Sequence, residues 1–522
     1  MKDFKELLVE SCTKHANKPA FLRTTKSRTQ EIVTYFQFLY EVKSLIQVLK
    51  RLEYSNDKIG IISENRYEWC VTFLAACICG KKVYPLDFHK QEKELEQEIL
   101  ESKIETLFFS SSVKEKIVTL FHKKKSNLRY LIGFDEDKSD AKIIAYEQFL
   151  AKGRYFQNYH TEEEKRVYAG MPSVILSTSG TKGKTKRVML SQENICSNLM
   201  GLQKRAAISS KDLFLSILPL YHAYEFTMGF LWPISKGATI VFSKGHSHFY
   251  EELKEYKPTV LLTVPSLCEN IEEKMITVAK QKKIAHQRKE MQELLGGKIR
   301  LLFCGAATLD RQVSYYFQKV GVPIYQVYGM TETAPVISME GPYLAKTGSI
   351  GKVLAGGKIK IENPNAQGIG EICYKGPNVM LGYENEENLT EKRVQENWIY
   401  TEDLGYLDKK GYLYFVGRKY NRIVLKNGET VYPEEIEEKL KKIKPIKEVV
   451  VYEKQAKLAA QIVLKEKYLE EKDIHNKVQQ EIDKMNEKMV PYKRVQKIEW
   501  REKAFPKTGV QKIKREIEEK EA

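Results

Sequence analysis

Hydroxyl, glycine and lysine side chains crowd one short stretch of the chain, residues 174–186, which reads V-I-L-S-T-S-G-T-K-G-K-T-K. In such a stretch, glycines let backbone N–H groups approach a phosphate, hydroxyls donate hydrogen bonds and ammonium groups neutralise negative charge. Its apolar start predicts a strand that leads into the turn. The stretch therefore predicts a loop that binds polyphosphate.

A Walker A loop is one alternative, because Gly183-Lys184-Thr185 matches the final G-K-T of that motif. The motif also needs a glycine five residues before Gly183, and that position holds Thr178. The Walker A interpretation fails on this residue. A plain solvated turn is the other alternative for the stretch taken alone.

Further blocks follow along the chain and change the balance between these alternatives. They read L-P-L-Y-H at 218–222, G-A-A at 305–307, Y-G-M-T-E-T at 328–333, T-E-D-L-G at 401–405, G-R at 417–418 and P-K-T at 506–508. With the phosphate loop, they resemble in order the motifs of the adenylate-forming superfamily, which includes acyl-CoA synthetases, adenylation domains of peptide synthetases and luciferases. The resemblance covers almost the whole chain.

The chain also departs from the family pattern. Lys182 stands where the family has a small residue, Thr185 replaces the usual proline, and Arg187 replaces the usual glycine after the lysine. Gln192 sits where a histidine is frequent, and the hinge position, often Asp or Lys, is Tyr420. These departures leave the detailed geometry of the phosphate loop open.

The resemblance implies an enzyme that uses ATP, Mg²⁺ and coenzyme A. Lys512, Glu332 and Thr331 would be its catalytic residues, and Thr178 and Glu332 would hold Mg²⁺, a hard cation that takes oxygen ligands. Tyr328 would stack on adenine, and the Asp403 carboxylate would accept hydrogen bonds from both ribose hydroxyls. The nucleotide-binding residues that it implies are Thr178, Ser179, Gly180, Thr181, Lys182, Gly183, Lys186, Gly305, Ala306, Ala307, Tyr328, Gly329, Met330, Asp403 and Arg418.

The acyl pocket is expected at Tyr221, His222 and Ala223. Relatives that activate amino acids commonly carry Asp at the place of Ala223; alanine would leave a substrate ammonium unpaired and costly to bury. Glu225 is an alternative partner for such a group. Residues 224–230 are apolar and rich in small residues on one side, and they resemble long-chain fatty acyl ligases more than peptide-synthetase domains. The resemblance therefore implies a medium- or long-chain fatty acid as the substrate.

The acceptor thiol is expected to belong to coenzyme A, with acyl carrier protein as the alternative because both present the same phosphopantetheine arm. Lys426-Asn427-Gly428 resembles the loop that flanks this arm. A non-catalytic adenylate- or lipid-binding homologue is a further alternative, since the phosphate loop is altered. Lys512 and Glu332 argue against it, because a protein that only binds has little use for both.

Alternating helical and strand-like stretches predict a mixed α/β fold. Residues 58–63, a helix at 67–79 and a strand at 82–86 follow βαβ order, and strands are expected again at 259–264, 299–304 and 322–328. From about 417 the chain becomes rich in Lys and Glu, with a helix from Pro433 and strands at 448–452 and 459–464. We expect stacked α/β sheets and a β-barrel-like subdomain in residues 1–419, then a small mobile α+β domain in residues 420–522 that carries Lys512.

Bulk composition bounds the cellular setting. Eight scattered cysteines without a C-x-x-C pair support neither a disulfide framework nor a zinc site. The start of the chain resembles no signal peptide, and its longest early apolar stretch, 71–79, is far shorter than a membrane span. We therefore expect a cytoplasmic protein.

Charge counts give 86 basic against 69 acidic residues, a net charge of +17. No nucleic-acid-binding motif accompanies the charge, so nucleic acid is not an expected partner. Peripheral contact with an anionic membrane, or attraction to coenzyme A phosphates or acyl carrier protein, stays open. The favoured interpretation is a solvated surface on which Lys alternates with Glu.

Overall fold

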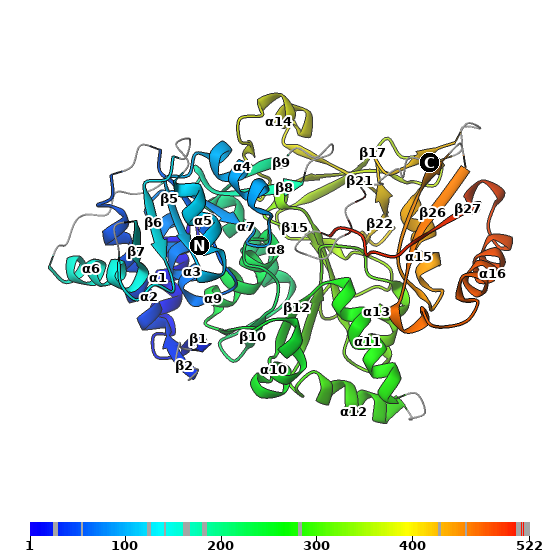
Figure 1. The fold of residues 1–522 in the computed structure, drawn as a ribbon, viewed down its shortest axis with the longest axis horizontal. Coiled ribbons are helices and arrows are strands. Elements are labelled where there is room, and N and C mark those ends of the chain that lie inside the picture. Colours follow the sequence, from blue (N-terminus) through cyan, green and yellow to red (C-terminus); the bar gives the residue numbers. More distant parts are fainter. Residues whose placement is uncertain are drawn as a thin grey trace. The chain divides into compact units, whose positions relative to one another are not determined.

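The computed structural model describes residues 1–24, 30–53, 56–122, 127–139, 142–159, 168–179, 185–279, 284–425, 430–454, 457–507, 513 and 515. The chain divides into two compact units, whose helices and strands are labelled in Figure 1. Unit 1 comprises Met1–Thr347, Gly351–Lys358 and Lys375–Trp398, and unit 2 comprises Gly348–Ile350, Ile359–Tyr374 and Ile399–Ala522.

An eight-stranded sheet in unit 1 carries the edge where the phosphate loop was predicted. Its order is β19-β9-β8-β4-β3-β5-β6-β7. The strands are β3 (Lys58–Ile62), β4 (Lys82–Leu86), β5 (Thr106–Phe109), β6 (Tyr130–Gly133), β7 (Ile143–Ala145), β8 (Pro172–Ser179), β9 (Thr185–Ser191) and β19 (Gly382–Tyr383). Strands β4 to β8 pair in parallel around β3, whereas β9 pairs antiparallel with both β8 and β19.

A nine-stranded sheet, also in unit 1, has the order β16-β15-β14-β13-β12-β10-β11-β1-β2. Its strands are β1 (Pro19–Thr24), β2 (Gln30–Thr34), β10 (Leu213–Ser216), β11 (Thr239–Phe242), β12 (Val260–Thr263), β13 (Leu301–Cys304), β14 (Ile324–Gly329), β15 (Val336–Met339) and β16 (Lys352–Val353). The run from β11 to β14 is parallel, so its strand ends meet at one edge.

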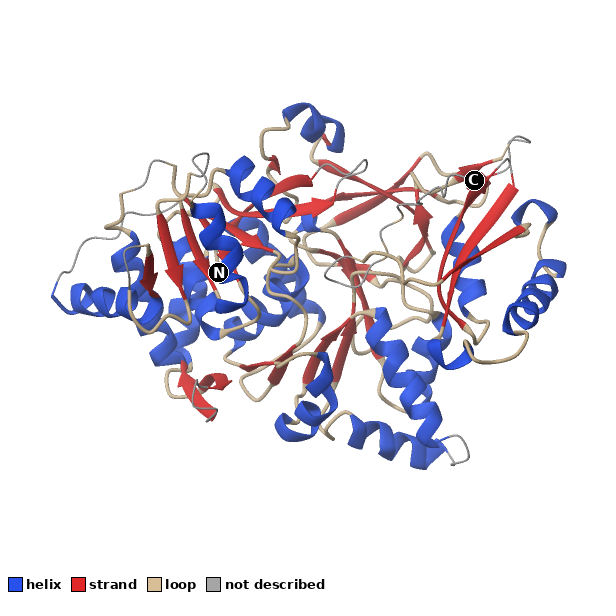
Figure 2. Ribbon diagram, in the orientation of Figure 1, coloured by secondary structure: helices blue, strands red, loops and turns tan. Residues whose placement is uncertain are grey.

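Helices cover the sheets of unit 1 (Figure 2). They are α1 (Phe4–Lys14), α2 (Tyr35–Leu49), α3 (Tyr67–Ile78), α4 (Glu92–Ser102), α5 (Lys114–Phe121), α6 (Tyr146–Tyr159), α7 (Gln192–Arg205), α8 (Ala223–Glu225), the π-helical turn η2 (Phe226–Leu231), α9 (Trp232–Lys236), α10 (Phe249–Tyr256), α11 (Pro265–Ala279), α12 (Ile284–Leu294), α13 (Arg311–Lys319) and α14 (Glu387–Arg393). Aromatic rings join α3 to η2: Trp69 and Phe73 stack, and the Phe73 ring lies 5.5 Å from Phe226. This contact packs α3, which follows β3, against η2, which comes after β10.

Unit 2 contains an antiparallel sheet and a small α+β part. The sheet holds β17 (Lys358–Glu362), β18 (Gly370–Lys375), β21 (Trp398–Leu407) and β22 (Leu413–Arg418), together with the two-residue strand β20 (Val394–Gln395). A two-stranded sheet holds β23 (Ile423–Val424) and β24 (Thr430–Val431). The α+β part holds α15 (Pro433–Lys441), β25 (Ile446–Lys454), β26 (Lys457–Leu464), α16 (Ile474–Glu487) and β27 (Lys497–Arg501). One apolar core joins its helices and sheet, with Ile436, Leu440, Val449, Ile462 and Val478 among its members.

The predicted mixed α/β fold is confirmed, with sheets, helices and a small C-terminal α+β part. Every strand and helix named from the sequence is present within a few residues of its expected bounds. The 419/420 domain boundary stays a prediction. Across the described ranges, no helix combines the length and apolar character of a membrane span.

Candidate nucleotide and acyl site

Three of the predicted blocks lie at one edge of the nine-stranded sheet. Residues 218–222 follow β10, residues 305–307 follow β13, and Tyr328 and Gly329 end β14. Because β10, β12, β13 and β14 run parallel, their carboxyl ends share this edge. Ligands of open α/β sheets bind at such an edge. The topology therefore gathers the predicted adenine and acyl blocks.

Two glycines at this edge are fixed by close packing. A Cβ on Gly305 would meet the ring of Tyr224 at 3.0 Å, and a Cβ on Gly329 would lie 1.9 Å from the carbonyl oxygen of Pro335. Ala306 adopts a left-handed backbone with φ of 68° and is exposed beside Ala307. These turns present backbone, rather than bulky side chains, to whatever occupies the edge.

Glu332 is fixed by its backbone and by its carboxylate. It lies in the 3₁₀ turn η4 (Thr331–Thr333) and is 6 % exposed. Its carbonyl oxygen accepts from the backbone N of Met380 at 2.8 Å, and its Oε1 accepts from the Tyr383 hydroxyl at 2.8 Å. The carboxylate is therefore held before a ligand arrives.

Strand β9 brings Lys186 to the same cluster. In the β8–β9 hairpin, Thr178 pairs with Lys186, and the Thr178 hydroxyl donates to the Lys186 carbonyl oxygen at 3.5 Å. The Lys186 ammonium lies 5.5 Å from the centroid of the Tyr383 ring, in cation–π geometry. Lys186 and Glu332, far apart in sequence, thus both contact Tyr383, Lys186 over the ring and Glu332 at the hydroxyl.

Several predicted residues lie outside the described part of the chain: Gly180, Thr181, Lys182, Gly183 and Lys512. Of Ser179, the structure describes the backbone, which ends β8. Lys507, a neighbour that could be mistaken for the predicted catalytic lysine Lys512, forms an ion pair with the buried carboxylate of Glu448 at 2.7 Å.

The predicted magnesium ligands fit an ion that is bound mainly by phosphates. Thr178 and Glu332 offer one hydroxyl and one carboxylate, too few oxygens for a protein cage. Mg²⁺ usually keeps waters and substrate phosphates as most of its ligands, with one or two carboxylates from the protein. Within the described residues, no group of three or more His, Cys, Asp and Glu side chains could hold a metal.

The acyl block is more tightly buried than the nucleotide turns. Tyr221 is 7 % and Ala223 is 5 % exposed, and every residue of η2 is buried. Burial lowers the pKa of His222 to about 4, with Asp87 and Lys90 acting in opposite directions. The imidazole is therefore neutral at physiological pH. A π-helical turn is rare and is frequent at functional sites.

Glu225, an acidic residue within this block, is only 1 % exposed. Its Oε1 accepts from the Ser216 hydroxyl at 2.6 Å. Its Oε2 has no hydrogen-bond partner among the described residues, and the same holds for His222 Nε2, the Tyr224 hydroxyl and Thr227 Oγ1. Burial raises the pKa of Glu225 to about 8, and the Ser216 hydrogen bond only partly offsets it.

In unit 2, Asp403 and Arg418 lie side by side. They pair across β21 and β22, and the Arg418 Nε lies 3.3 Å from Asp403 Oδ1. Asp403 is 5 % exposed, whereas Tyr420 at the predicted hinge is 65 % exposed. The carboxylate is therefore presented on a regular strand, and the hinge residue lies at the surface.

The departures from the family pattern have structural explanations at two positions. Gln192 accepts from the backbone N of Phe4 at 3.0 Å and donates to the carbonyl oxygen of Cys77 at 2.8 Å, so it ties α1, α3 and α7 together. Arg187 forms an ion pair with Glu384 at 2.9 Å. Sequence reasoning missed Tyr383 and Glu384, since no local pattern shows that β19 pairs with β9.

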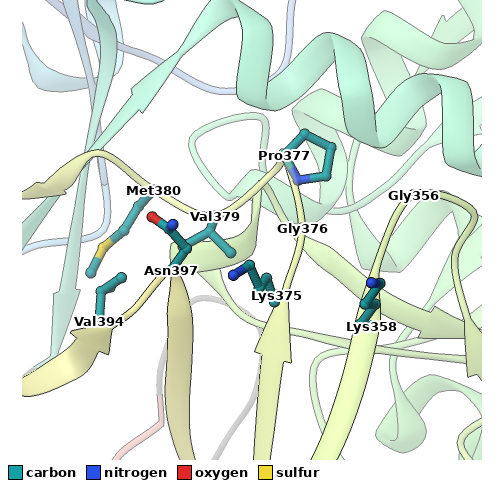
Figure 3. Close-up of a pocket in the computed structure, with 9 residues that line it drawn as sticks. All are labelled: Gly356, Lys358, Lys375, Gly376, Pro377, Val379, Met380, Val394 and Asn397. Atoms are coloured by element: carbon teal, nitrogen blue, oxygen red, sulfur yellow. The ribbon is translucent and has the colours of Figure 1, made fainter.

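A depression of about 450 Å³ lies beside the segment that precedes β19 (Figure 3). It is lined by Gly356, Lys358, Lys375, Gly376, Pro377, Val379, Met380, Val394 and Asn397. Lys358 and Lys375 project from neighbouring strands, and Met380 is the residue whose N–H holds Glu332. None of the residues predicted to bind nucleotide lines this depression.

Comparison with known proteins gives relatives along nearly the whole chain. The mouse long-chain-fatty-acid–CoA ligase ACSBG2 is 26 % identical over 498 residues, which cover 84 % of this chain and 73 % of that one. The 2-succinylbenzoate–CoA ligase of Lactococcus lactis is 26 % identical over 427 residues, covering 81 % and 82 %. The crystal structure of the anthranilate CoA ligase AuaEII with anthranoyl-AMP superposes with a TM-score of 0.81 at 19 % identity, covering 98 % and 95 %.

The family model of AMP-binding enzymes matches residues 8–384, and that of the AMP-binding enzyme C-terminal domain matches residues 421–521. These two matches span the β8–β9 hairpin with the predicted phosphate loop, the η4 turn and the C-terminal part, in the order in which the motifs occur. The chain belongs to the AMP-binding enzyme family, the adenylate-forming superfamily that its motifs resemble.

Proposed function

We propose that the protein is an acyl-CoA ligase that activates a medium- or long-chain fatty acid with ATP through an acyl-adenylate and then transfers the acyl group to coenzyme A. Family membership supports the adenylation, and the activities for which relatives are named give both fatty and aromatic acids as candidate substrates. The choice between them rests on the acyl block.

One observation carries the choice of a fatty acid. The acyl block offers Ala223 and the buried η2 turn, and its only acidic side chain, Glu225, is bonded to Ser216 and has a pKa of about 8. A neutral carboxyl group gives no ionic partner to a substrate ammonium, which would remain costly to bury. An apolar acyl chain meets no such cost.

Adenylation brings a carboxylate to the α-phosphate of ATP, so the site must offset anionic repulsion and align the attack. Lys186 supplies positive charge beside Thr178, and Thr331 lies next to Glu332 in the η4 turn. Glu332 and Thr178 would hold Mg²⁺, which neutralises phosphate charge when bound. The Asp403 carboxylate accepts hydrogen bonds from the ribose hydroxyls. Lys512 stabilises the negative charge that builds between the substrate carboxylate and the α-phosphate.

Thiol attack forms the second half-reaction. In this proposal the domain of residues 420–522 carries Lys512 to the first half-reaction and swings about Tyr420 before the second. Coenzyme A is the proposed acceptor, and acyl carrier protein is the alternative that presents the same arm. A cytoplasmic enzyme with peripheral contact to an anionic membrane would reach its acyl substrate there.

The test is ATP–pyrophosphate exchange driven by a panel of carboxylic acids: octanoate, palmitate, oleate, anthranilate, 2-succinylbenzoate, acetate and several α-amino acids. We expect the fatty acids to support exchange far better than the others. Adding coenzyme A or acyl carrier protein to the best acid then identifies the acceptor by thioester mass.

A matched variant sharpens the assignment of the acyl block. Ala223→Asp introduces the residue typical of amino-acid-activating relatives and should depress exchange with fatty acids, because it buries a carboxylate beside the chain. An aromatic acid or an α-amino acid as the best substrate contradicts the proposed acyl class. No exchange with any acid favours a binding-only homologue.

A further inference from the structure

A buried polar cluster joins Arg187 of β9, the strand that follows the predicted phosphate loop, to Glu384, the residue after β19. Glu384 is 8 % exposed. Its Oε2 accepts from Arg187 Nε at 2.9 Å, and its Oε1 accepts from Lys58 Nζ at 2.9 Å and from the Tyr84 hydroxyl at 2.6 Å. Arg187 also bonds Glu101 at 3.0 Å.

The cluster is joined to the nucleotide side by backbone pairing. Glu384 N donates to the Arg187 carbonyl oxygen at 2.8 Å, and Tyr383 pairs with Val188 in the β9–β19 ladder. Each residue of the ion pair therefore follows a residue of the Lys186–Tyr383–Glu332 cluster. Lys186, which is predicted to bind nucleotide, precedes Arg187, and Tyr383, the hydrogen-bond partner of Glu332, precedes Glu384.

The cluster is poorly explained by stability alone. Removing two charges from water costs several kcal/mol per ion, and apolar residues of similar volume often stabilise a protein equally well. Here the side chains of Arg187 and Glu384 are 12 % and 9 % exposed, so both are largely desolvated. A directional pair instead fixes the register of two strands, and Arg187 stands where the family usually has a glycine without any side chain.

Burial alone would raise the pKa of Glu384. Hydrogen bonds from Tyr84 and Lys58, with the charges of Lys58 and Arg187, outweigh burial, and the pKa lies below its ordinary value. The carboxylate is therefore ionised at physiological pH and holds three donors at once. Its geometry is over-determined in the way that a positioning group requires.

We infer that Glu384 is a positioning residue for ATP binding, which acts through Arg187 to hold β9 so that Lys186 lies against Tyr383 beside Glu332. The inference rests on the proposed function for the identity of the nucleotide. It assigns no contact with substrate to Glu384, whose effect passes through the β9–β19 ladder.

The test compares Glu384→Gln with Asp212→Asn, a matched loss of charge in another ion pair of unit 1. Asp212 is 4 % exposed, and its two carboxylate oxygens accept hydrogen bonds from Arg300 at 2.8 and 2.6 Å. It precedes β10, and Arg300 precedes β13, so this pair lies at the amino ends of the strands, away from the predicted nucleotide edge. Both variants should unfold at lower temperature.

The readout is the KM for ATP–Mg²⁺ in adenylation, together with the rise in unfolding temperature that ATP–Mg²⁺ produces without any acid. Glu384→Gln should raise KM about tenfold, shrink the ATP-induced rise and change kcat less, whereas Asp212→Asn should leave both nucleotide readouts unchanged. Equal KM values for the two variants overturn the inference.

Arg187→Gly, which restores the usual family residue, keeps the test decisive if Glu384→Gln does not fold. It should raise KM by a similar factor, and adding Glu384→Gln to it should change KM little further, because both substitutions break one interaction. Fully additive effects, or a normal KM in Arg187→Gly, contradict the inference. Failure of every acid in the exchange assay would overturn the proposed function alone, since the ATP-induced rise needs no acid.

Discussion

Two buried glutamates, Glu384 and Glu225, differ in the hydrogen bonds that their carboxyl groups accept and in the direction in which their pKa values are shifted. Both belong to unit 1, and they are 8 % and 1 % exposed. Glu384 has three donors on its two oxygens and a pKa below the ordinary value. Glu225 has one donor, an Oε2 without a partner among the described residues, and a pKa raised to about 8.

The difference separates a preorganised region from a permissive one. On the proposed nucleotide side, Lys186, Tyr383 and Glu332 are held together by protein contacts, which suits the placement of charge for a reaction. In the acyl block, five buried polar atoms have no hydrogen-bond partner among the described residues: His222 Nε2, Glu225 Oε2, Thr227 Oγ1 and the hydroxyls of Tyr221 and Tyr224. An unpartnered buried polar atom costs about 1–3 kcal/mol. That cost falls in the region where an apolar chain is proposed to bind.

The largest expected effect tests whether the nucleotide side serves only one half-reaction. Lys512→Ala should lower adenylation by about 100–1,000-fold, because it removes a positioned charge from the α-phosphate. The variant should still convert supplied acyl-AMP and coenzyme A to thioester at nearly the normal rate. Equal losses in both half-reactions, measured separately, would contradict this division; Lys507→Ala, which only breaks the pair with Glu448, is the control.

Glu332→Gln probes the preorganised carboxylate itself. The amide keeps an oxygen for the Tyr383 hydroxyl but removes the charge that would hold Mg²⁺. We expect adenylation to fall by about 10–100-fold at limiting Mg²⁺ and to recover in part at high Mg²⁺. The measurement is a Mg²⁺ titration of pyrophosphate exchange, and an unchanged titration curve would refute the metal role.

Glu225→Gln tests the permissive region through stability against pH. The folded pKa of Glu225 exceeds its unfolded value, so unfolding releases a proton between about pH 4.5 and pH 8, and wild-type stability falls across that window. Glutamine cannot ionise, so the variant should be more stable than wild type by a few kcal/mol near pH 8 and above, and the advantage should vanish below about pH 4.5.

Glu384→Gln supplies the opposite sign as a control for that comparison. Its folded pKa is depressed, so its stabilisation is present above the unfolded pKa and is lost as pH falls through the folded pKa. The variant should therefore be less stable than wild type at neutral pH and converge with it in acid. Urea unfolding of both variants across pH decides the matter, and parallel curves for the two would contradict the contrast.

Sequence reasoning reached the parts of the molecule that local patterns encode. The βαβ stretches, the turns at strand ends and the ordered blocks all follow from short segments, and β4 occupies the residues expected for it. The ion pair of Arg187 and Glu384 joins residues 197 apart through an edge strand of only two residues. No periodicity predicts so short a strand. No sequence pattern predicts the π-helical turn η2 that follows the buried Glu225 either.

The smallest expected effect concerns the hydroxyl of Tyr383, which links the two halves of the preorganised cluster. Tyr383→Phe keeps the ring beside Lys186 and removes only the donor to Glu332 Oε1. A hydrogen bond to a charged group contributes about 1.5–3 kcal/mol at most, and water or Mg²⁺ can replace part of it here. We therefore expect adenylation to fall about threefold to tenfold, chiefly through a weaker response to Mg²⁺.

Tyr383→Leu also removes the ring and should lower adenylation further, since Lys186 then loses its cation–π contact. If the phenylalanine and leucine variants lose the same activity, the ring does not position Lys186. If neither loses any, Glu332 is held well enough by the backbone bond from Met380, and the cluster is less interdependent than its geometry indicates.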